Sequence, residues 1–394
     1  MPVFSLAERY VRKKLKSANL RLAACLHVSK ETSVLISSLN SIGFKIRLVA
    51  ANPLSSQSEV VSYLSEIGVD VRARRGESVE EYQSEIIGAA NSQPDFILDD
   101  GGDLHVAYSQ TSSNTCFGGT DETTSGTTRL AALEKSSKLR YPAIPVNEAK
   151  TKHLFDNRYG TGQSAVDGLV RATGLLIAGK TLVVSGYGWV GKGVAERARG
   201  LGARVIVTEV DPIRALEATL DGYQVLQMRD AARVGDIFLT CTGQINVINS
   251  KHFGLLKDEA ILGNVGHFNE EIDTRELLRN GISAEQVRKG VAKIRLLNSK
   301  SIYLLDQGRV VNLISAEGHP PEIMQLSFAN QLLSIYYLIL HKKELVKSPK
   351  KLLTFPNEID QLVAEFAVEG FGLKIDKLDA KQNRYAKSFT RGSA

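Results

Sequence analysis

The sequence predicts an α/β protein with two doubly wound parallel-sheet domains, joined by hinges and followed by a short C-terminal extension. Three observations support this fold class. Short apolar runs alternate with helical patterns from residue 20 to about residue 146, which is typical of a parallel sheet covered by helices. A glycine-rich turn at residues 186–193 lies between an apolar run and a helical pattern. The length of 394 residues is sufficient for two domains with separate cores.

The composition is that of a globular protein, with 43% hydrophobic and 23% charged residues. No apolar run approaches the roughly 20 residues that span a bilayer. The first 20 residues are rich in Lys and Arg but lack the apolar core and cleavage site of a signal peptide. We therefore expect a cytoplasmic protein with no membrane partner.

Charge and cysteine content argue against two further classes of protein. The net charge of +6 is modest for this length, and the basic residues are spread along the chain, whereas nucleic-acid binding needs a concentrated basic face. The three cysteines, Cys25, Cys116 and Cys241, are widely separated and have the spacing of neither a metal site nor a disulfide framework. We expect buried thiols, no metal and no nucleic-acid partner.

The first region of alternation places polar residues at the ends of strands. In open parallel sheets, ligands bind beyond the carboxyl ends of the strands. His27 closes the first expected strand, and Asp-Asp-Gly-Gly-Asp at residues 99–103 closes another, where glycine lets the backbone approach a small molecule. Taken alone, a structural histidine and an acidic turn explain these features equally well. The expected strands are 22–27, 45–50, 69–73 and 96–99, and the expected helices are 32–42 and 56–67.

The next segments contain polar and charged residues in a pattern. Residues 119–126 are rich in hydroxyl groups and are expected to form a loop that caps a helix, and residues 142–145 mark a break. Lys152 and Asp156 are four residues apart, so they would share one face of a helical turn. The alternative is an exposed ion pair, which would contribute little to stability. A helix is expected over residues 164–173.

The glycine-rich turn has the order that dinucleotide binding requires, with a strand expected before it and a helix after it. Gly186 permits the tight turn, Gly188 lets the backbone approach a pyrophosphate, and Gly191 allows close packing of helix on strand. The N-terminus of the helix attracts phosphate. The next apolar run ends in Glu209, 18 residues after Gly191. A carboxylate there can bind both ribose hydroxyls and repel a 2′-phosphate, so NAD is predicted as the cofactor. Arg214 follows and would favour NADP, but Glu209 has the more direct position.

The later strands of this second domain are expected at residues 236–240, 260–267, 302–305 and 310–313. Residues 317–321 have the composition of a hinge, and an amphipathic helix is expected over residues 322–340. The predicted substrate-binding domain comprises residues 1–150 and 320–345, the NAD-binding domain residues 162–317, and a C-terminal segment for oligomer contacts residues 346–394. Thr242, Gly243, His267 and Asn312 fall at or near strand ends on the cofactor side.

Seven motifs together resemble one family. They are CLHVS at 25–29, DDGGD at 99–103, ETTSG at 122–126, KHLFDN at 152–157, GYGWVGKG at 186–193, GNVGHF at 263–268 and VNLISAEGHP at 311–320. In this order, over roughly residues 20–335, they resemble the S-adenosyl-L-homocysteine hydrolase family, in particular its shorter archaeal and thermophilic-bacterial members. The resemblance implies reversible hydrolysis of S-adenosyl-L-homocysteine to adenosine and L-homocysteine. It also implies tightly bound NAD, which transiently oxidises the ribose 3′-OH, and a homotetramer.

The resemblance also implies roles for individual residues. Lys152 would take the proton of the 3′-OH, which requires a lowered pKa, while Asp100 would handle the C4′ proton and His27 would serve the departing sulfur. The implied catalytic set is His27, Asp100, Glu122, Lys152, Asp156 and His267. Ser29, Glu31, Gln57, His319 and Met324 complete the implied substrate-binding set with Asp100, Glu122, Lys152 and Asp156. The implied NAD-binding set is Thr123, Thr124, Ser125, Asn157, Gly186, Gly188, Val190, Gly191, Glu209, Thr242, Asn312 and His319.

Three positions depart from the family pattern. Thr161 replaces a frequent cysteine, and Glu317 replaces a frequent methionine near the purine base, which leaves S-inosyl-L-homocysteine open as an alternative substrate. Residues 385–394 do not reproduce the basic, tyrosine-containing tail that reaches the NAD of a neighbouring protomer, although Lys387 or Arg391 could replace it. An NAD-dependent hydroxy-acid dehydrogenase is the alternative activity, but it would give no reason for the KHLFDN and DDGGD motifs to occur together.

Overall fold

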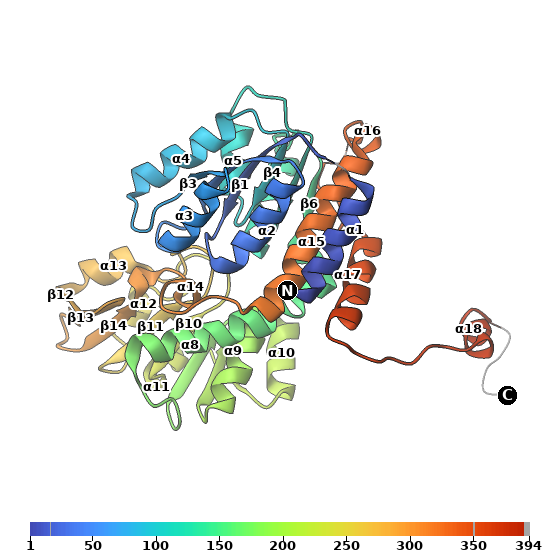
Figure 1. Ribbon diagram of the computed structural model, residues 1–394. Coiled ribbons are helices and arrows are strands. Elements are labelled where there is room, and N and C mark those ends of the chain that lie inside the picture. The colour runs from blue at the N-terminus through green and yellow to red at the C-terminus, as the bar shows by residue number, and fades with distance from the viewer. Residues whose placement is uncertain (16, 350, 390–394) are drawn as a thin grey trace.

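The computed structural model describes residues 1–15, 17–349 and 351–389. Two α/β units lie one above the other, each built around its own sheet (Figure 1). The chain leaves the first unit through residues 146–161 and returns to it after residue 315. The second unit is therefore inserted between the first sheet and the long C-terminal helix that packs on that sheet.

The first unit contains a six-stranded parallel sheet in the order β3-β2-β1-β4-β5-β6. Its central strand is apolar because helices cover both faces of the sheet. Leu22, Ala24 and Leu26 pack into one core, and Ala23 and Cys25 into the other. The strands are β1 (Arg21–Leu26), β2 (Lys45–Ala50), β3 (Asp70–Arg72), β4 (Phe96–Asp99), β5 (Gly118–Asp121) and β6 (Ala143–Pro145).

Helices from both ends of the chain cover this sheet. The helices α1 (Pro2–Lys14), α2 (Lys30–Ser41), α3 (Ser58–Glu66), α15 (Pro321–Leu340) and α17 (Asn357–Gly370) contribute to one core. The helices α4 (Val79–Asn91), α5 (Asp103–Ser109) and α6 (Thr124–Lys135) form the other with the opposite face. The sequence analysis identifies α2 and α3 but not α1, whose basic residues lie in its last turn.

The second unit contains an eight-stranded sheet in the order β12-β13-β14-β11-β10-β7-β8-β9. Its strands are β7 (Thr181–Ser185), β8 (Arg204–Thr208), β9 (Gln224–Val225), β10 (Ile237–Thr240), β11 (Ala260–Asn264), β12 (Gly281–Arg288), β13 (Val291–Leu296) and β14 (Ser301–Leu305). The hairpin of β12 and β13 is antiparallel and was not predicted. The helices are α8 (Thr161–Thr173), α9 (Trp189–Gly200), α10 (Pro212–Leu220), α11 (Met228–Val234), α12 (Ser250–Phe253), α13 (Thr274–Arg279) and α14 (Val311–Ile314).

Three local predictions are wrong. Residues 119–121 form the buried strand β5 instead of a loop, because their polar side chains are hydrogen-bonded inside the protein. Residues 143–145 form the edge strand β6, since a proline is tolerated at an edge. The expected strand at 310–313 contributes only a bridge from Val310 to Asn264, and the chain then turns into α14.

The helix α15 is not amphipathic, in contrast to the prediction. It is buried nearly all round between α1, α17 and the first sheet. By length and hydropathy it could span a bilayer, so the sequence analysis overlooked an apolar run of that size, but 72% of its most apolar window is buried inside the protein. Its polar side chains, including Ser327 and Gln331, are buried as well and face the site described below.

The connection between the units is a series of short turns, η1 (Val146–Glu148), α7 (Lys150–His153) and the π-helix η2 (Asp156–Gly160). After α15 come α16 (Lys342–Leu345) and a segment at 351–353 that hydrogen-bonds to Ala143 of β6. The helix α17 then packs on α1 and α15. Residues 371–389, including α18 (Ala380–Ala386), extend away from both units (Figure 1). Arg391 lies outside the described residues.

Candidate active site

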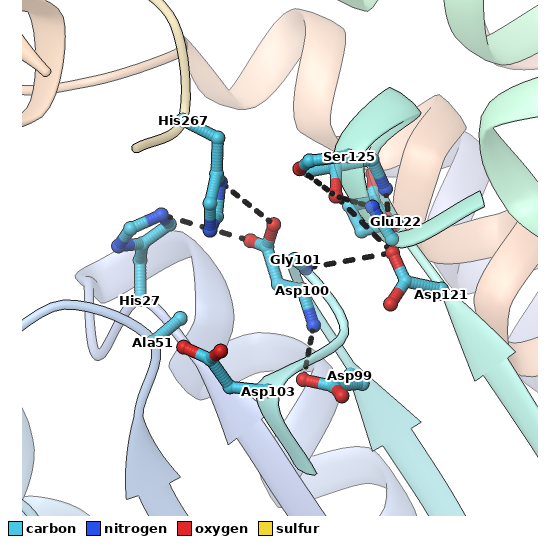
Figure 2. Close-up of polar contacts among 12 residues, drawn as sticks. His27, Ala51, Asp99, Asp100, Gly101, Asp103, Asp121, Glu122, Ser125 and His267 are labelled. Carbon is cyan, nitrogen blue, oxygen red and sulfur yellow. Dashed lines mark hydrogen bonds and ion pairs between the residues drawn. The ribbon is translucent and has the colours of Figure 1, made fainter. Parts of the chain in front are cut away.

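Asp100 lies between two histidines that come from different units. One carboxylate oxygen of Asp100 is 3.8 Å from Nε2 of His27, at the end of β1, and the other is 3.9 Å from Nδ1 of His267, which follows β11 (Figure 2). The neighbouring Phe268 packs against the guanidinium of Arg129 on α6, 4.5 Å from its ring centroid. The sequence prediction that His27, Asp100 and His267 converge is therefore reproduced in the geometry.

Glycine makes this convergence possible. Gly101 has φ 111° and Gly102 has φ 87°, a backbone conformation that other residues rarely adopt. A Cβ atom on Gly101 would lie 2.1 Å from Nε2 of His267. The turn after β4 therefore lets the loop of the second unit close on it, and the backbone N–H of Asp100 is fixed by the side chain of Asp99 at 2.9 Å.

The hydrogen bonds of His27 determine which of its nitrogens carries the proton. Ser55 donates its hydroxyl proton to the carbonyl of Asn52 (3.0 Å), so its oxygen accepts from Nδ1 of His27 (2.7 Å). The Nε2 atom, which faces Asp100, is then free to accept a proton. Burial lowers the pKa of His27 to about 3 and that of His267 to about 4, so both rings are neutral near pH 7. Burial raises the pKa of Asp100 well above its usual range, and the charge of Glu122 adds to this.

Lys152 is the centre of a second buried cluster. Its ammonium lies 2.8 Å from Asp156, 2.8 Å from Asn157, 3.3 Å from Asn147 and 3.9 Å from Glu122. The lysine side chain is only 3% exposed and that of Asp156 6%. The alternative of an exposed surface ion pair is therefore wrong, because Lys152 and Asp156 face the interior where the two units meet.

The charges of this cluster support one another. Burial lowers the pKa of Lys152, but the carboxylates of Asp156 and Glu122 outweigh this and raise it overall. Burial raises the pKa of Asp156, yet His319 and Lys152 bring it well below its ordinary value. The lowered lysine pKa that a base requires is thus not present in the free site, where Lys152 is an ammonium ion. A ligand has to change this balance before the lysine can accept a proton.

Several residues that hold the cluster were missed in the sequence. The carboxylate of Glu122 accepts hydrogen bonds from Ser327 and Gln331 of α15. Asn147 in η1 accepts from Lys152 and from Asn157. Two polar residues four apart within an apolar helix were a usable signal, because buried polar groups need partners. For Asn147 the sequence offered no such signal.

His319 belongs to the Lys152 cluster. Its Nδ1 atom is 2.5 Å from Asp156, and its Nε2 atom is 3.1 Å from the hydroxyl of Thr161 and 3.4 Å from the amide of Asn312. Thr161 therefore orients His319 at the position where cysteine is frequent in the family. Asn312 is buried, and among the described residues its Oδ1 atom has no hydrogen-bond partner.

The glycine-rich turn fits a dinucleotide. Gly186 has φ 93°, and a Cβ atom on Gly191 would lie 1.9 Å from the carbonyl oxygen of Gly186. Gly188 is the N-cap of α9 and Val190 lies in the first turn of that helix. Glu209 ends β8 beside the turn and accepts the backbone N–H of Tyr187 at 2.7 Å. A pyrophosphate can thus approach the helix N-terminus, and a carboxylate stands where the adenosine ribose would lie.

The remaining residues of the predicted NAD set lie on both sides of the cleft. Thr123 is the N-cap of α6, accepts the N–H of Gly126 and hydrogen-bonds to Ser125 at 3.0 Å. Thr124 accepts from the amide of Asn147 at 3.1 Å. Thr242 donates its N–H and its hydroxyl to Glu271, a residue that the sequence analysis missed.

The other predicted substrate residues lie near the start of α2 and α15. Ser29 caps α2, and Gln57 accepts the backbone N–H of Lys30 at 3.2 Å. Glu31 is buried in the first turn of α2. Met324 packs on the apolar core of the first unit. These four residues are placed beside the site, and no hydrogen bond or ion pair described for them reaches Lys152 or Asp100.

Two groups of side chains have a spacing that could hold a metal ion. They are His27, Asp100 and His267, and the fully buried Asp99, His105 and Asp121. The absence of a metal cofactor stays a prediction. Cys25 and Cys116 are buried free thiols, as predicted, while Cys241 is only partly buried.

The fold and the site define an NAD-binding enzyme whose reactive side chains lie between two α/β units. The model of the NAD-binding domain of S-adenosyl-L-homocysteine hydrolase matches residues 157–318, and that of S-adenosyl-L-homocysteine hydrolase matches residues 1–115. The chain is 47% identical to adenosylhomocysteinase of Sulfurisphaera tokodaii, over all of this chain and 94% of that protein. It is 48% identical to that of Aeropyrum pernix, over 94% and 89%, and 46% identical to that of Aquifex aeolicus, over 100% and 94%.

The chain therefore belongs to the S-adenosyl-L-homocysteine hydrolase family and is an NAD-dependent adenosylhomocysteinase. Likeness to solved structures is weaker. A dipicolinate synthase of Bacillus halodurans covers 82% of this chain and 99% of its own, with a TM-score of 0.49 and 15% identity.

Proposed function

We propose that the two clusters described above carry out reversible hydrolysis of S-adenosyl-L-homocysteine through transient oxidation of the ribose 3′-OH. The observation that carries this proposal is the burial of Lys152 among Asp156, Glu122 and Asn157, where the two units meet. A lysine enclosed by acceptors is costly to bury, and this arrangement provides polar partners for a ligand that carries several hydroxyl groups.

Lys152 is the proposed base for the 3′-OH, and Asp156 and Glu122 hold the ribose hydroxyls. A hydroxyl placed among these three side chains would meet an ammonium and two carboxylates, since both carboxylates lie within 4 Å of the ammonium. When the carboxylates accept hydrogen bonds from the ribose, their hold on the ammonium weakens and the pKa of Lys152 falls. The free amine can then take the 3′-OH proton.

Asp100 is the proposed acceptor of the C4′ proton. A buried carboxylate with a raised pKa is a stronger base than an exposed one. The proton can then pass to Nε2 of His27, which is an acceptor in the free site, and from there to the sulfur of homocysteine as the bond from C5′ to sulfur breaks. In the second half of the cycle His27 and Asp100 return the proton from the water that adds to C5′. His267 contacts the ribose from the second unit.

The glycine-rich turn, Glu209, Thr242 and Asn312 are proposed to hold NAD together with residues 123–125 and Asn157 of the first unit. Bound NAD would accept a hydride from C3′ of the ribose and return it after the addition of water. The unpaired Oδ1 atom of Asn312 is available to a carboxamide N–H, which fits the proposed position of the nicotinamide.

The base of the nucleoside remains the main choice within this function. Glu317 pairs with Lys30 of α2 at 3.3 Å and with Arg171 of α8 at 3.5 Å, so its carboxylate is already engaged at the edge of the cleft. We therefore propose the adenosyl compound as substrate, with the inosyl compound as the alternative. A reaction that contains both compounds in equal amounts, analysed for adenosine and inosine, decides between them.

We also propose a cytoplasmic homotetramer. The segment after α17 carries apolar side chains that are largely exposed in a single chain (Figure 1), which is unfavourable in water and typical of a surface that another copy covers. These side chains are Phe371, Leu373, Ile375, Leu378 and Tyr385. Light scattering of the full chain and of a chain that ends at residue 370 tests this, because only the full chain should be tetrameric.

The function itself is tested on the purified protein with S-adenosyl-L-homocysteine as substrate. We expect release of homocysteine thiol and adenosine in equal amounts, without net consumption of NAD. Denatured protein should release nicotinamide cofactor that dialysis of the native protein does not remove. Thiol release without any bound cofactor would contradict the proposed chemistry.

A further inference from the structure

Asp121, the last residue of β5, lies directly beneath the turn that carries Asp100. It is completely buried, and no role has been assigned to it above. Its Oδ1 atom accepts three hydrogen bonds, from the backbone N–H of Gly101 (3.4 Å), from the N–H of Thr123 (3.0 Å) and from the hydroxyl of Thr123 (3.1 Å). One carboxylate oxygen thus connects two separate segments of the site.

These two segments carry different parts of the proposed chemistry. Gly101 follows the proposed base Asp100, whereas Thr123 follows Glu122, which is proposed to hold the ribose. Figure 2 shows the Asp121 side chain below the turn, with Asp100 directed upward to the two histidines. Since strands β4 and β5 are paired so that Asp99 lies opposite Asp121, two buried carboxylates hold consecutive N–H groups of the turn.

The surroundings of Asp121 are shaped to keep its carboxylate in this position. A Cβ atom on Gly126 would lie 1.8 Å from Oδ1 of Asp121, so only glycine at this point of α6 leaves room for the carboxylate. On the other side His105 approaches Oδ2 at 3.8 Å. That ring is itself fixed by the hydroxyl of Tyr141 at 2.7 Å and the carbonyl of Thr120 at 3.2 Å.

We propose that Asp121 is a positioning residue for proton transfer at C4′, because it sets the Asp100 turn relative to the ribose-binding residue Glu122. The inference rests on the proposed role of Asp100. Glu122 is held independently by Ser327 and Gln331 of α15. Loss of Asp121 should therefore displace Asp100 and leave the grip on the ribose in place, so the proton-transfer step should suffer more than the oxidation step.

The test separates these two steps with adenosine as ligand. Reduction of bound NAD on addition of adenosine reports oxidation at C3′, and uptake of deuterium from heavy water at C4′, followed by NMR, reports proton transfer. For Asp121→Ala we expect deuterium uptake to fall about 100-fold, as for a reacting group displaced by about 1 Å, and NAD reduction to fall by less than about tenfold. Asp121→Asn retains an oxygen that can accept from Gly101 and Thr123, and it should rescue most of the deuterium uptake.

Gly126→Ala is a second variant, which pushes the carboxylate away without deleting it, and it should show the same selective loss. A parallel fall of both steps in the two variants, or unchanged deuterium uptake in Asp121→Ala, would overturn the inference. Asp100→Asn distinguishes this from failure of the proposed function. If that variant still takes up deuterium at C4′, Asp100 is not the base. If it takes up none while Asp121→Ala is normal, only the positioning role is lost.

Discussion

The carboxyl ends of the two parallel sheets contribute to one cleft, but they do so with different chemical groups. The first sheet places buried ionisable side chains there, and Asp99, Asp100, Asp121 and Glu122 all follow directly from or end its strands. The second sheet mainly offers backbone, in a turn whose glycines leave room for a ligand, with Glu209 as its nearby carboxylate. The reactive charges are thus concentrated in one unit and the cofactor turn in the other.

This difference follows from what each ligand needs. A pyrophosphate is bound by N–H groups at a helix N-terminus, which requires close approach and no side chain. A ribose that is to be oxidised and deprotonated needs bases with altered pKa values, which burial and neighbouring charges provide. Buried charges are expensive unless they are paired, so the first unit provides Asn147, Ser327 and Gln331 as partners.

The largest expected effect is that of Lys152→Ala on turnover. Removal of the proposed base should lower kcat by about 1,000-fold or more. It also leaves two buried carboxylates without their cation, so the melting temperature should fall. Steady-state rates, circular dichroism and NAD content of the variant separate these effects. Lys150→Ala, on the same helix but exposed, is the matched control and should retain activity. Normal turnover in the Lys152 variant would remove this lysine from the mechanism.

The backbone site should be as sensitive to a single methyl group as the first unit is to a lost charge. Gly191→Ala places a Cβ atom 1.9 Å from the carbonyl oxygen of Gly186, so the turn has to open. We expect NAD affinity to fall about 100-fold, which corresponds to about 2.7 kcal/mol. Gly200→Ala, at the end of the same helix, has nothing within 4 Å of the added atom and should bind NAD normally. Equal NAD retention by both variants would contradict the proposed role of the turn.

The same difference explains what could be predicted from the sequence. The cofactor turn is local, because Gly186, Gly191 and Glu209 follow one another along a strand, a helix and the next strand. The alternation of strands and helices likewise predicts both parallel sheets. The hairpin of β12 and β13 was missed because its strands are short, polar and largely exposed on one side.

The cluster around Lys152 was predictable only in part. Lys152 and Asp156 are close in sequence, and the family resemblance brings in Glu122. The partners of Glu122 come from α15, about 205 residues away along the chain, and no local pattern connects them. The direction of the Lys152 pKa shift was also beyond the sequence, because it depends on the distances to two carboxylates in the folded protein.

The pH dependence of the first step provides a sharper test of the side-chain site. Because the pKa of Lys152 is raised in the free site, the rate of NAD reduction by adenosine should increase with pH up to the limit of stability. Asp156→Asn removes the strongest influence that raises this pKa, so burial dominates and the amine loses its proton more readily. The alkaline limb should then move to lower pH by about one to three units. Asp167→Asn, at an exposed ion pair with Arg171, is the control, and an unmoved limb in the Asp156 variant would exclude the proposed coupling.

The smallest effect is expected at Glu209, the carboxylate beside the cofactor turn. Its two oxygens accept the backbone N–H groups of Tyr187, Val210 and Asp211. Gln has only one acceptor oxygen and no charge, so Glu209→Gln weakens both the turn and the grip on the ribose. We expect NAD affinity to fall about tenfold, the size of one charge-assisted hydrogen bond, and discrimination against NADP to decrease because the repulsive charge is gone. Glu196→Gln, at an exposed pair with Arg158, should change neither affinity. If Glu209→Gln binds NAD as tightly as the unmodified protein and still rejects NADP, the second unit recognises the cofactor through its backbone alone.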